Sequence, residues 1–236
     1  MKSTFTAALR ASTTPVIAEV KVRGGDGTQL LRGRSVADVV AAYHEAGAAA
    51  LSVVTGRWFG GTCELLHEVA SRTDLPLLRK DFVVGRAQLR RTKELGASAV
   101  LLTARLLPAG RLPELVHQAL ELDLTPFVEV ADETEIAGLG AVAPDCVVAV
   151  NNSDIATRET AGDPGRDLRL LPAVLGTGTA FPVSAGGIDD PARAARLLAA
   201  GYTGLLVATA LLTADHPAAW FADLRRNLTT EHRESP

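Results

Sequence analysis

Charged side chains end three apolar segments of this sequence, and they are of the kinds that move protons. Lys80 closes one apolar run, Glu129 lies near the end of another, and Glu19 with Lys21 ends a third. Partial desolvation and neighbouring cations lower the pKa of a lysine, which lets it donate a proton near neutral pH. A carboxylate beside apolar residues shifts the opposite way and can accept a proton. Together these residues predict a reaction with two opposed proton transfers.

Glu19 and Lys21 are two residues apart on an expected strand, so both side chains point to the same side of it. A buried ion pair is the simpler interpretation, because a buried charge is tolerated when it is paired. With Lys80 and Glu129, however, four charged groups would meet in one place, which is more than packing requires. We therefore favour a catalytic role for these residues.

The elements that must position these groups are visible in the hydrophobic pattern. From Pro15 onward, short apolar segments alternate with helix-length amphipathic segments, which is typical of βα units and a parallel sheet. All strands of a parallel barrel end at one face, where sites are built. Eight strands are expected, which favours a single closed (β/α)8 TIM barrel of the α/β class over an open sheet; they are residues 15–21, 50–55, 76–80, 99–102, 125–130, 147–151, 181–184 and 204–208.

Helix boundaries are marked by capping residues. Ser35 with Asp38 and Asp132 with Glu135 have the spacing of capping boxes, and Asp190 precedes a proline at a first helical position. Three glycines follow apolar helix faces and are expected to end helices in the left-handed conformation; these are Gly47, Gly96 and Gly201. The caps support the alternation of helices and strands.

The composition describes one domain of ordinary charge. The chain has 236 residues, and we expect one barrel domain over 1–236, with a short N-terminal lead at 1–14 and a polar C-terminal tail at 229–236. Aromatic residues make up only 4%, so the core is expected to consist of Ala, Val and Leu. A net charge of -3 gives no basic footprint for nucleic acid. A monomer or a homodimer is expected.

The remaining signals exclude several other classes of protein. Polar residues interrupt the start of the chain, so neither a signal peptide nor a membrane span is expected, and the protein is predicted to be cytoplasmic. Cys63 and Cys146 are far apart and lack metal-ligand spacing, which favours two free thiols. The histidines show no ligand spacing either. No metal and no cofactor are predicted.

Small and polar residues follow the last two expected strands. Ser184, Gly186 and Gly187 come at the end of the seventh strand, and Ala208 and Thr209 at the end of the eighth. Loops at these positions form the usual phosphate site of TIM barrels, because glycine lets backbone N–H groups approach the phosphate oxygens. A plain turn is the alternative for a Gly-Gly pair. Its position in the barrel favours a phosphorylated small-molecule substrate.

Two further segments are candidates with open roles. Asn151 begins the run Asn-Asn-Ser-Asp, which extends to Asp154 and either orients a substrate hydroxyl group or caps the next loop. Arg57 and Phe59 lie in a glycine-bearing loop after the second strand, which either covers a flat ring or packs as a satellite cluster. We count Arg57, Phe59 and Asn151 among the candidate substrate contacts.

These motifs together resemble the indole-3-glycerol phosphate synthase family. The similar segments extend from about Phe5 to Leu228; they are Val-Ile-Ala-Glu-Val-Lys at 16–21, Ala-Ala-Leu-Ser-Val-Val-Thr at 49–55, Leu-Arg-Lys-Asp-Phe at 78–82, Val-Glu-Val at 128–130 and Val-Asn-Asn at 150–152. The resemblance implies a TIM-barrel carboxy-lyase of tryptophan biosynthesis. Its substrate would be an anthranilate-bearing deoxyribulose phosphate, which undergoes ring closure, decarboxylation and dehydration to an indole.

The resemblance also implies roles for individual residues. Lys80 would be the general acid that protonates the ketone oxygen as the aryl carbon attacks the ketone carbon. Glu129 would be the base for the later dehydration. Lys21 would contact the substrate and help the leaving hydroxyl, with Glu19 as its partner, and Asn151 would orient the substrate.

The chain departs from the family pattern around the substrate. Residues 24–26, Gly-Gly-Asp, stand where the family has Ser-Pro-Ser, which predicts a more mobile and more acidic covering loop. Ser153 stands in place of an arginine, Ala185 in place of a glutamate and Ala208 in place of a glycine. The helix that leads the family's chains is largely missing before Phe5.

These departures predict a divergent member that acts on a modified anthranilate-type substrate, with Arg57 or Arg23 compensating for the lost arginine.

Two alternatives stand beside this interpretation. One is a sugar-phosphate isomerase such as phosphoribosylanthranilate isomerase, a family that places a cysteine where this chain has Lys21. The other is a non-catalytic barrel that binds a sugar phosphate, which the changes at Ser153 and Ala185 suggest.

Overall fold

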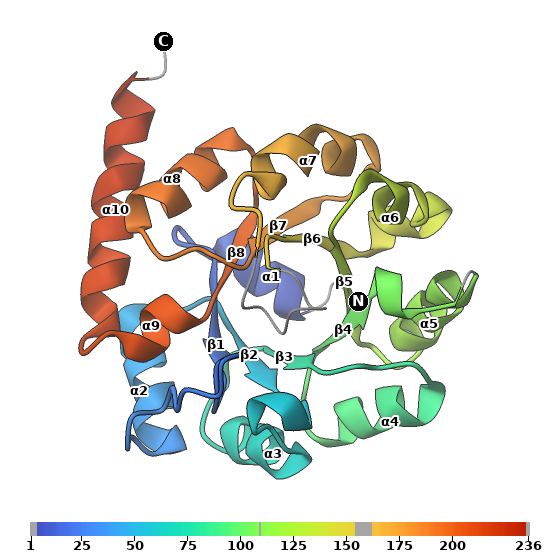
Figure 1. The fold of residues 1–236 in the computed structure, drawn as a ribbon, viewed down its shortest axis with the longest axis horizontal. Helices are drawn as coiled ribbons and strands as arrows, with labels where there is room; N and C mark the ends of the chain where they lie inside the picture. Colours follow the sequence, from blue (N-terminus) through green and yellow to red (C-terminus); the bar gives the residue numbers. More distant parts are fainter. Residues whose placement is uncertain (1–3, 109, 154–161, 235–236) are drawn as a thin grey trace.

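Eight parallel strands form a closed barrel in the computed structural model, which describes residues 4–108, 110–153 and 162–234 (Figure 1). The strands are β1 (Val16–Val20), β2 (Ala50–Val54), β3 (Leu77–Lys80), β4 (Ala99–Thr103), β5 (Thr125–Val130), β6 (Val147–Asn151), β7 (Phe181–Ala185) and β8 (Gly204–Val207). Each strand begins and ends within one residue of its predicted bounds. The expected TIM barrel is confirmed.

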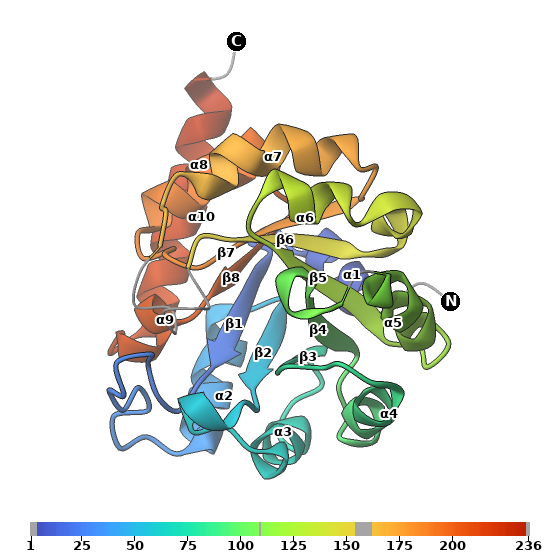
Figure 2. The same cartoon turned by 45° about the vertical axis from the view of Figure 1, so that its right-hand side comes forward.

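Helices surround the barrel on the outside (Figures 1 and 2). The outer helices are α2 (Val36–Ala46), α3 (Cys63–Ala70), α4 (Arg86–Glu94), α5 (Arg111–Leu120), α6 (Glu133–Ala137), α7 (Arg166–Gly176), α8 (Pro191–Ala200) and α10 (Pro217–Glu234). Shorter elements are η1 (Arg57–Phe59), η2 (Ala104–Leu106), η3 (Gly140–Asp145) and α9 (Thr209–Thr213). Helix α10 packs against α8 and α2, and so covers the place where the last and first units meet.

The helix caps agree with the sequence, with one exception. The Ser35 hydroxyl accepts from the N–H of Asp38, whose carboxylate accepts from the N–H of Ser35, which is a complete capping box. At α6, Asp132 accepts from the N–H of Glu135, but the Glu135 carboxylate accepts from the N–H of Ala131 at 2.7 Å. That box is therefore only half formed. The glycines expected to end helices all have positive φ; they are Gly47, Gly96 and Gly201.

The core lies on both faces of the sheet. A cluster inside the barrel includes Ile17, Leu78, Phe127, Val183 and Leu206. A larger cluster fills the space between the outer face of the strands and the helices. Because most strand residues are buried on one face or the other, the strands read as nearly continuous apolar runs, which is why they could be located in the sequence.

Closure of the barrel pairs the first strand with the last. Residues 16–18 of β1 pair in parallel with residues 205–207 of β8. On its other side β1 pairs with β2, so the first strand has a neighbour on both sides. The last strand of the chain therefore completes the sheet around the first.

The N-terminal lead forms a helix that closes one end of the barrel. Helix α1 (Thr4–Ala11) lies in the centre of the ring in Figure 1. Phe5 and Leu9 are buried, and the Phe5 ring meets the Phe127 ring edge to face with 6.3 Å between centroids. Leu9 also contacts the start of β8 near Gly204, which places α1 at the end where the strands begin.

The predicted tail belongs to α10, which continues to Glu234. Residues 1–3 of the lead, Asp154 and residues 235–236 of the tail lie outside the described residues. Within the described residues, every helix is too short or too polar to cross a membrane.

Cys146 should resist alkylation at about pH 8, whereas Cys63 should react. The Cys146 thiol is buried and donates to the carbonyl of Val142 at 3.1 Å, and burial raises its pKa to about 12. The raised pKa favours the neutral thiol, so this group contributes stability below the ordinary thiol pKa and loses it as pH rises toward 12. Cys63 is partly exposed. Mass spectrometry after iodoacetamide treatment measures the labelling of each cysteine. Denatured protein, in which both cysteines should react, is the control. Equal labelling of the two cysteines in the native protein would contradict the prediction.

Candidate active site

A cavity of about 690 Å³ opens at the end of the barrel where the strands end. Its walls come from the loop after β1, the end of β3, and the loops after β6, β7 and β8. The predicted site residues that line it are Glu19, Lys21, Lys80, Asn151, Gly186, Gly187, Ala208 and Thr209. The barrel thus brings together most of the residues that the sequence singled out.

Glu19 lies at the centre of the charged groups. Its side chain is 1% exposed. Its Oε1 lies 3.6 Å from Lys21 Nζ, and its Oε2 lies 3.8 Å from Lys80 Nζ. The Ser52 hydroxyl donates to Oε2 at 3.1 Å. Two ammonium groups and a hydroxyl offset the cost of desolvating the carboxylate. Glu19 therefore holds both lysines at the cavity wall.

The direction of Lys80 follows from the buried side chain before it. The Arg79 guanidinium donates to Asp81 at 2.8 Å, to Thr55 at 3.1 Å and to Thr92 at 3.1 Å. These partners lie between the strands and α3 and α4, so Arg79 points outward. Successive side chains on a strand alternate, which directs Lys80 into the mouth of the barrel. The sequence motif that contains Arg79 thus combines a structural anchor with a candidate catalytic group.

Glu129 lies in a neighbouring compartment. It is 4% exposed near the end of β5 and lines a small cavity of about 10 Å³. Asn151 and Ser153 line both this cavity and the main one, so they form a common wall. Lys80 and Glu129 are therefore at the same end of the barrel, in adjoining cavities.

The aromatic loop after β2 borders the site through Lys21. Phe59 is buried, and the centre of its ring lies 5.3 Å from Lys21 Nζ, within the range of a cation–π contact. Trp58 is 66% exposed and its ring lies 5.4 Å from that of Phe82. Arg57 is exposed and stands outside the described lining of the main cavity. Phe59 thus contacts one of the charged groups, whereas Arg57 does not belong to the described lining of the main cavity.

The loop after β1 brings an acidic residue to the cavity. The N–H of Gly24 donates to the carbonyl of Thr28 at 2.9 Å, which closes a turn. Asp26 accepts from the backbone N–H and the hydroxyl of Thr28, and these bonds lower the pKa of its carboxyl. Asp26 lines the cavity, as expected of a more acidic loop.

The loop after β7 contains two glycines in the left-handed conformation, Gly186 with φ 77° and Gly187 with φ 65°. A Cβ on Gly186 would lie 2.6 Å from both Asn151 Oδ1 and Ser153 Oγ. The close approach of this loop to the end of β6 therefore requires glycine. Ser184 is buried behind the loop, on the helix side of β7, where its hydroxyl donates to Asp167 at 2.8 Å.

Replacing Gly186 with alanine should lower the melting temperature more than replacing Gly187 with alanine. Both positions strain a residue with a Cβ by about 1–2 kcal/mol, because both have positive φ. Among the described residues, a new methyl group would collide with neighbours at Gly186, whereas no described atom lies within 4 Å of a Cβ on Gly187. Thermal denaturation of the two variants measures the difference, and equal melting temperatures would contradict it.

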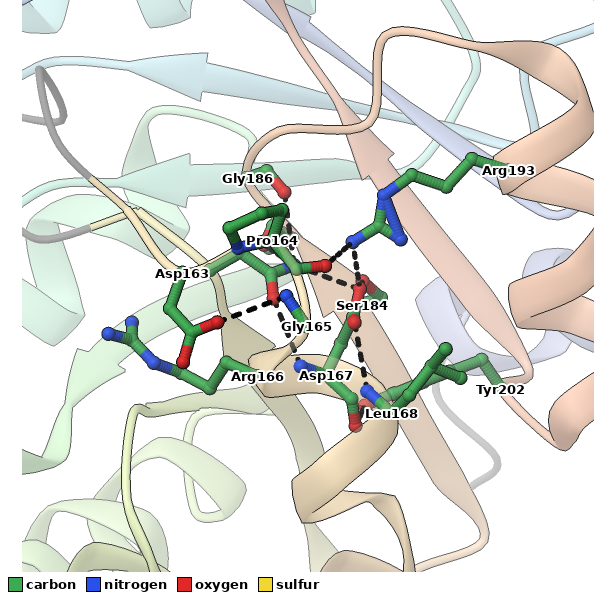
Figure 3. Close-up of polar contacts among 12 residues, drawn as sticks. Asp163, Pro164, Gly165, Arg166, Asp167, Leu168, Ser184, Gly186, Arg193 and Tyr202 are labelled. Carbon is green, nitrogen blue, oxygen red and sulfur yellow. Dashed lines mark hydrogen bonds and ion pairs between the residues drawn. The ribbon is translucent and has the colours of Figure 1, made fainter.

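A buried hydrogen-bond network supports the loops after β6 and β7 (Figure 3). Asp167 on α7 accepts from Asn152, Ser184 and Arg193. The sequence reasoning did not single out Asp167 or Arg193. A signal was present, because Asp167 shares the buried stripe of α7 with Leu170, Leu171 and Val174. An acidic residue at an apolar position of an amphipathic helix indicates a buried polar network.

Comparison with known proteins agrees with this site. The family model described as indole-3-glycerol phosphate synthase matches residues 1–224. The chain is similar to the indole-3-glycerol phosphate synthase of Pyrococcus furiosus, with 38% identity over 214 residues, 89% of this chain and 90% of that protein. It is also similar to the enzyme of that name from Aquifex aeolicus, with 34% identity over 216 residues, 90% of this chain and 82% of that protein.

A third relative is longer. The tryptophan biosynthesis protein TrpCD of Archaeoglobus fulgidus is 39% identical over 175 residues, which are 74% of this chain and 31% of that protein. With a family match over nearly its whole length, this chain belongs to the indole-3-glycerol phosphate synthase family.

Proposed function

We propose that this protein converts 1-(2-carboxyphenylamino)-1-deoxyribulose 5-phosphate to indole-3-glycerol phosphate, with release of carbon dioxide and water. The reaction forms a bond between the aryl carbon and the ketone carbon, loses the carboxylate and then eliminates the hydroxyl group. Family membership supports this activity. The observation that carries it is the buried Glu19, which holds Lys21 and Lys80 within 4 Å at the wall of a cavity large enough for such a substrate.

Lys80 is the proposed general acid of the first step. Attack by the aryl carbon places negative charge on the ketone oxygen, and a positioned ammonium group both stabilises that charge and supplies a proton. The side chain of Lys80 is 11% exposed, which limits competition from water. Lys21, which shares the Glu19 carboxylate with Lys80, is the group proposed to assist departure of the hydroxyl group.

Glu129 is the proposed base of the dehydration. Loss of the hydroxyl group requires a proton to leave the ring, and the buried Glu129 carboxylate lies beyond the wall formed by Asn151 and Ser153. Asn151 ends β6 beside both cavities and is the residue proposed to orient the substrate, while its Oδ1 also accepts from the N–H of Ser153 at 2.9 Å and so caps the loop. The two opposed proton transfers are thereby assigned to groups in adjoining cavities.

The phosphate group is assigned to the loops after β7 and β8. The described lining of the main cavity has two lysines and four carboxylates, namely Lys21, Lys80, Glu19, Asp26, Asp163 and Asp189. Charge in this described part of the lining therefore does not favour an anion. Backbone N–H groups of Gly186 and Gly187, with the hydroxyl of Thr209, are the donors that we assign to the phosphate oxygens.

Incubation of the purified protein with the carboxyphenylamino-deoxyribulose phosphate tests this proposal. Indole fluorescence should rise, and carbon dioxide should be released in equal amount. Heat-denatured protein is the control. Absence of turnover of this compound and of ring-substituted analogues would contradict the proposal and would favour a barrel that only binds a sugar phosphate. The isomerase alternative is not favoured, because the family match is to the synthase.

Ring-substituted analogues address the aryl group of the substrate. Ser153 and Ala185 are small residues in the wall of the main cavity, at the positions where the sequence departs from the family pattern. We propose that they leave room for a methyl or hydroxyl substituent on the aryl ring, as in specialised indole biosynthesis. A larger kcat/KM for a substituted substrate than for the unsubstituted one would support this proposal, and the reverse order would contradict it.

A further inference from the structure

Asp167 is a buried carboxylate that accepts hydrogen bonds on both oxygens. It is fully buried, and its Oδ2 accepts from Asn152 Nδ2 at 2.9 Å, from Ser184 Oγ at 2.8 Å and from an Arg193 amino group at 2.8 Å. Its Oδ1 accepts from the N–H of Leu168 at 2.8 Å. Figure 3 shows how these contacts gather behind the loop that follows β7. None of the assigned chemical steps uses this group.

The side chain of Asn152 connects Asp167 to the loop. Asn152 Nδ2 donates to the carbonyls of Ala185 at 3.0 Å and of Gly186 at 3.1 Å, and its backbone N–H donates to the Ala185 carbonyl at 2.8 Å. Its Oδ1 accepts from the N–H of Asp167 at 3.0 Å, so the amide is held at both ends. Asp167 thus fixes the orientation of the Asn152 amide, which in turn fixes two successive carbonyls.

Fixing those carbonyls also fixes the N–H groups that follow them. In a planar trans peptide the C=O and the N–H point in opposite directions. The carbonyls of Ala185 and Gly186 point back toward Asn152, so the N–H groups of Gly186 and Gly187 point away from it. Both glycines line the main cavity. Successive backbone N–H groups that point the same way form an anion-binding concavity.

Arg193 joins the same carboxylate to the segment that precedes α7. Its guanidinium, on α8, donates to Asp167 and to the carbonyl of Pro164 at 2.6 Å. Pro164 itself lines the main cavity. The network therefore links α7, α8 and the loops after β6 and β7 through Asp167 and its direct donors.

We propose that Asp167 is a positioning residue that preorganises the N–H groups of Gly186 and Gly187 for the phosphate group of the substrate. This inference rests on the proposed function and deepens it, because it makes phosphate binding by the two glycines depend on a residue outside the cavity. Asp167 acts through Asn152 and does not touch the substrate.

A purely structural role predicts different behaviour. Replacing a buried ionic group by one of similar shape lowers stability wherever the group is located, without changing how the folded protein selects a phosphate. A positioning role predicts a loss that depends on the phosphate. Asp167→Asn keeps the shape of the side chain but removes the charge and one acceptor oxygen. Tyr202→Phe is the matched control, because the Tyr202 hydroxyl donates to the backbone carbonyl of Asp167 and leaves its carboxylate intact.

Kinetics with two substrates separate the roles. For the phosphorylated substrate, Asp167→Asn should raise KM by about tenfold with little change in kcat, as expected for a weakened ground-state contact. For the dephosphorylated analogue the variant should match the wild type. Tyr202→Phe should match the wild type with both. An equal loss with both substrates, or no loss with either, would overturn the proposal.

Inorganic phosphate provides a test that does not depend on turnover. Phosphorus NMR titration of the wild type and of the two variants should show weaker binding to Asp167→Asn only. Should Asp167→Asn not fold, Arg193→Lys serves instead. The Arg193 side chain is 17% exposed, and the substituted lysine keeps the positive charge. This variant should weaken phosphate binding by about threefold. Absence of phosphate binding to the wild type, or equal binding by all variants that fold, would overturn the proposal. If the wild type binds phosphate but does not turn over the substrate, only the proposed function is overturned.

Discussion

Replacing Lys80 with methionine should lower kcat by about a thousandfold, as expected for loss of a general acid. Methionine keeps most of the length of the side chain but has no proton to donate. Glu19 retains Lys21 at 3.6 Å and the Ser52 hydroxyl at 3.1 Å, so the buried carboxylate keeps partners and the barrel should stay folded. Indole formation under saturating substrate measures kcat, and circular dichroism verifies the fold.

Lys93→Met is the matched control for this variant. Lys93 is exposed on α4, where its ammonium group donates to the carbonyl of Asp123 at 3.2 Å. The control should keep the activity of the wild type, because it removes the same group from the outer surface. Activity of Lys80→Met within a factor of about three of the control would remove Lys80 from the acid role.

Replacing Glu129 with glutamine should lower kcat by about a hundredfold or more, as expected for loss of a general base. The amide matches the carboxylate in shape, so the small cavity beside Asn151 and Ser153 should stay intact. Stopped-time assays of indole formation under saturating substrate measure kcat.

Glu133→Gln is the control for the change of a carboxylate to an amide. Glu133 begins α6, close in the chain to Glu129, but is exposed. Its variant should keep the rate of the wild type. If the kcat of Glu129→Gln stays within a factor of about three of this control, the proton acceptor is another group. Glu19 would then be the next candidate, because it is 1% exposed and lies between the two lysines.

The strands could be predicted because the physics that locates them is local. Each strand is buried on both faces, so its apolar run stands out against the polar helix surfaces that flank it. The convergence of Lys80 with Glu19 and Lys21 followed from the barrel itself, since parallel strands end at one face. The half-formed capping box at Asp132 was less predictable, because the Glu135 carboxylate has a second N–H, that of Ala131, within reach.

The side chain of Ser184 points away from the main cavity, so it does not make the phosphate contact that its position in the chain predicts. Val183 and Ala185 belong to the cluster inside the barrel, so strand alternation places Ser184 on the helix side. Its bond to Asp167 also needs a helix from a different unit, and such tertiary partners are not encoded in local spacing.

The separate compartment of Glu129 depends on tertiary structure in the same way. That Lys80 and Glu129 lie at one end of the barrel followed from the strands. That Asn151 and Ser153 stand between their cavities depends on how closely the loop after β7 approaches the end of β6, which the missing Cβ of Gly186 permits. A contact of this kind is set by distances of a few tenths of an ångström, beyond what spacing in a sequence conveys.

The pairing of β1 with β8 has a consequence for the newly made polypeptide. Residues 16–18 cannot pair with their second neighbouring strand until residues 205–207 have been synthesised. At roughly 5–20 residues per second, a ribosome takes about 10–40 s to cover that interval. During this time the exposed edge of β1 presents unpaired backbone groups beside Glu19 and Lys21. These charges, for which we propose catalytic roles, should also discourage other chains from pairing with that edge during synthesis.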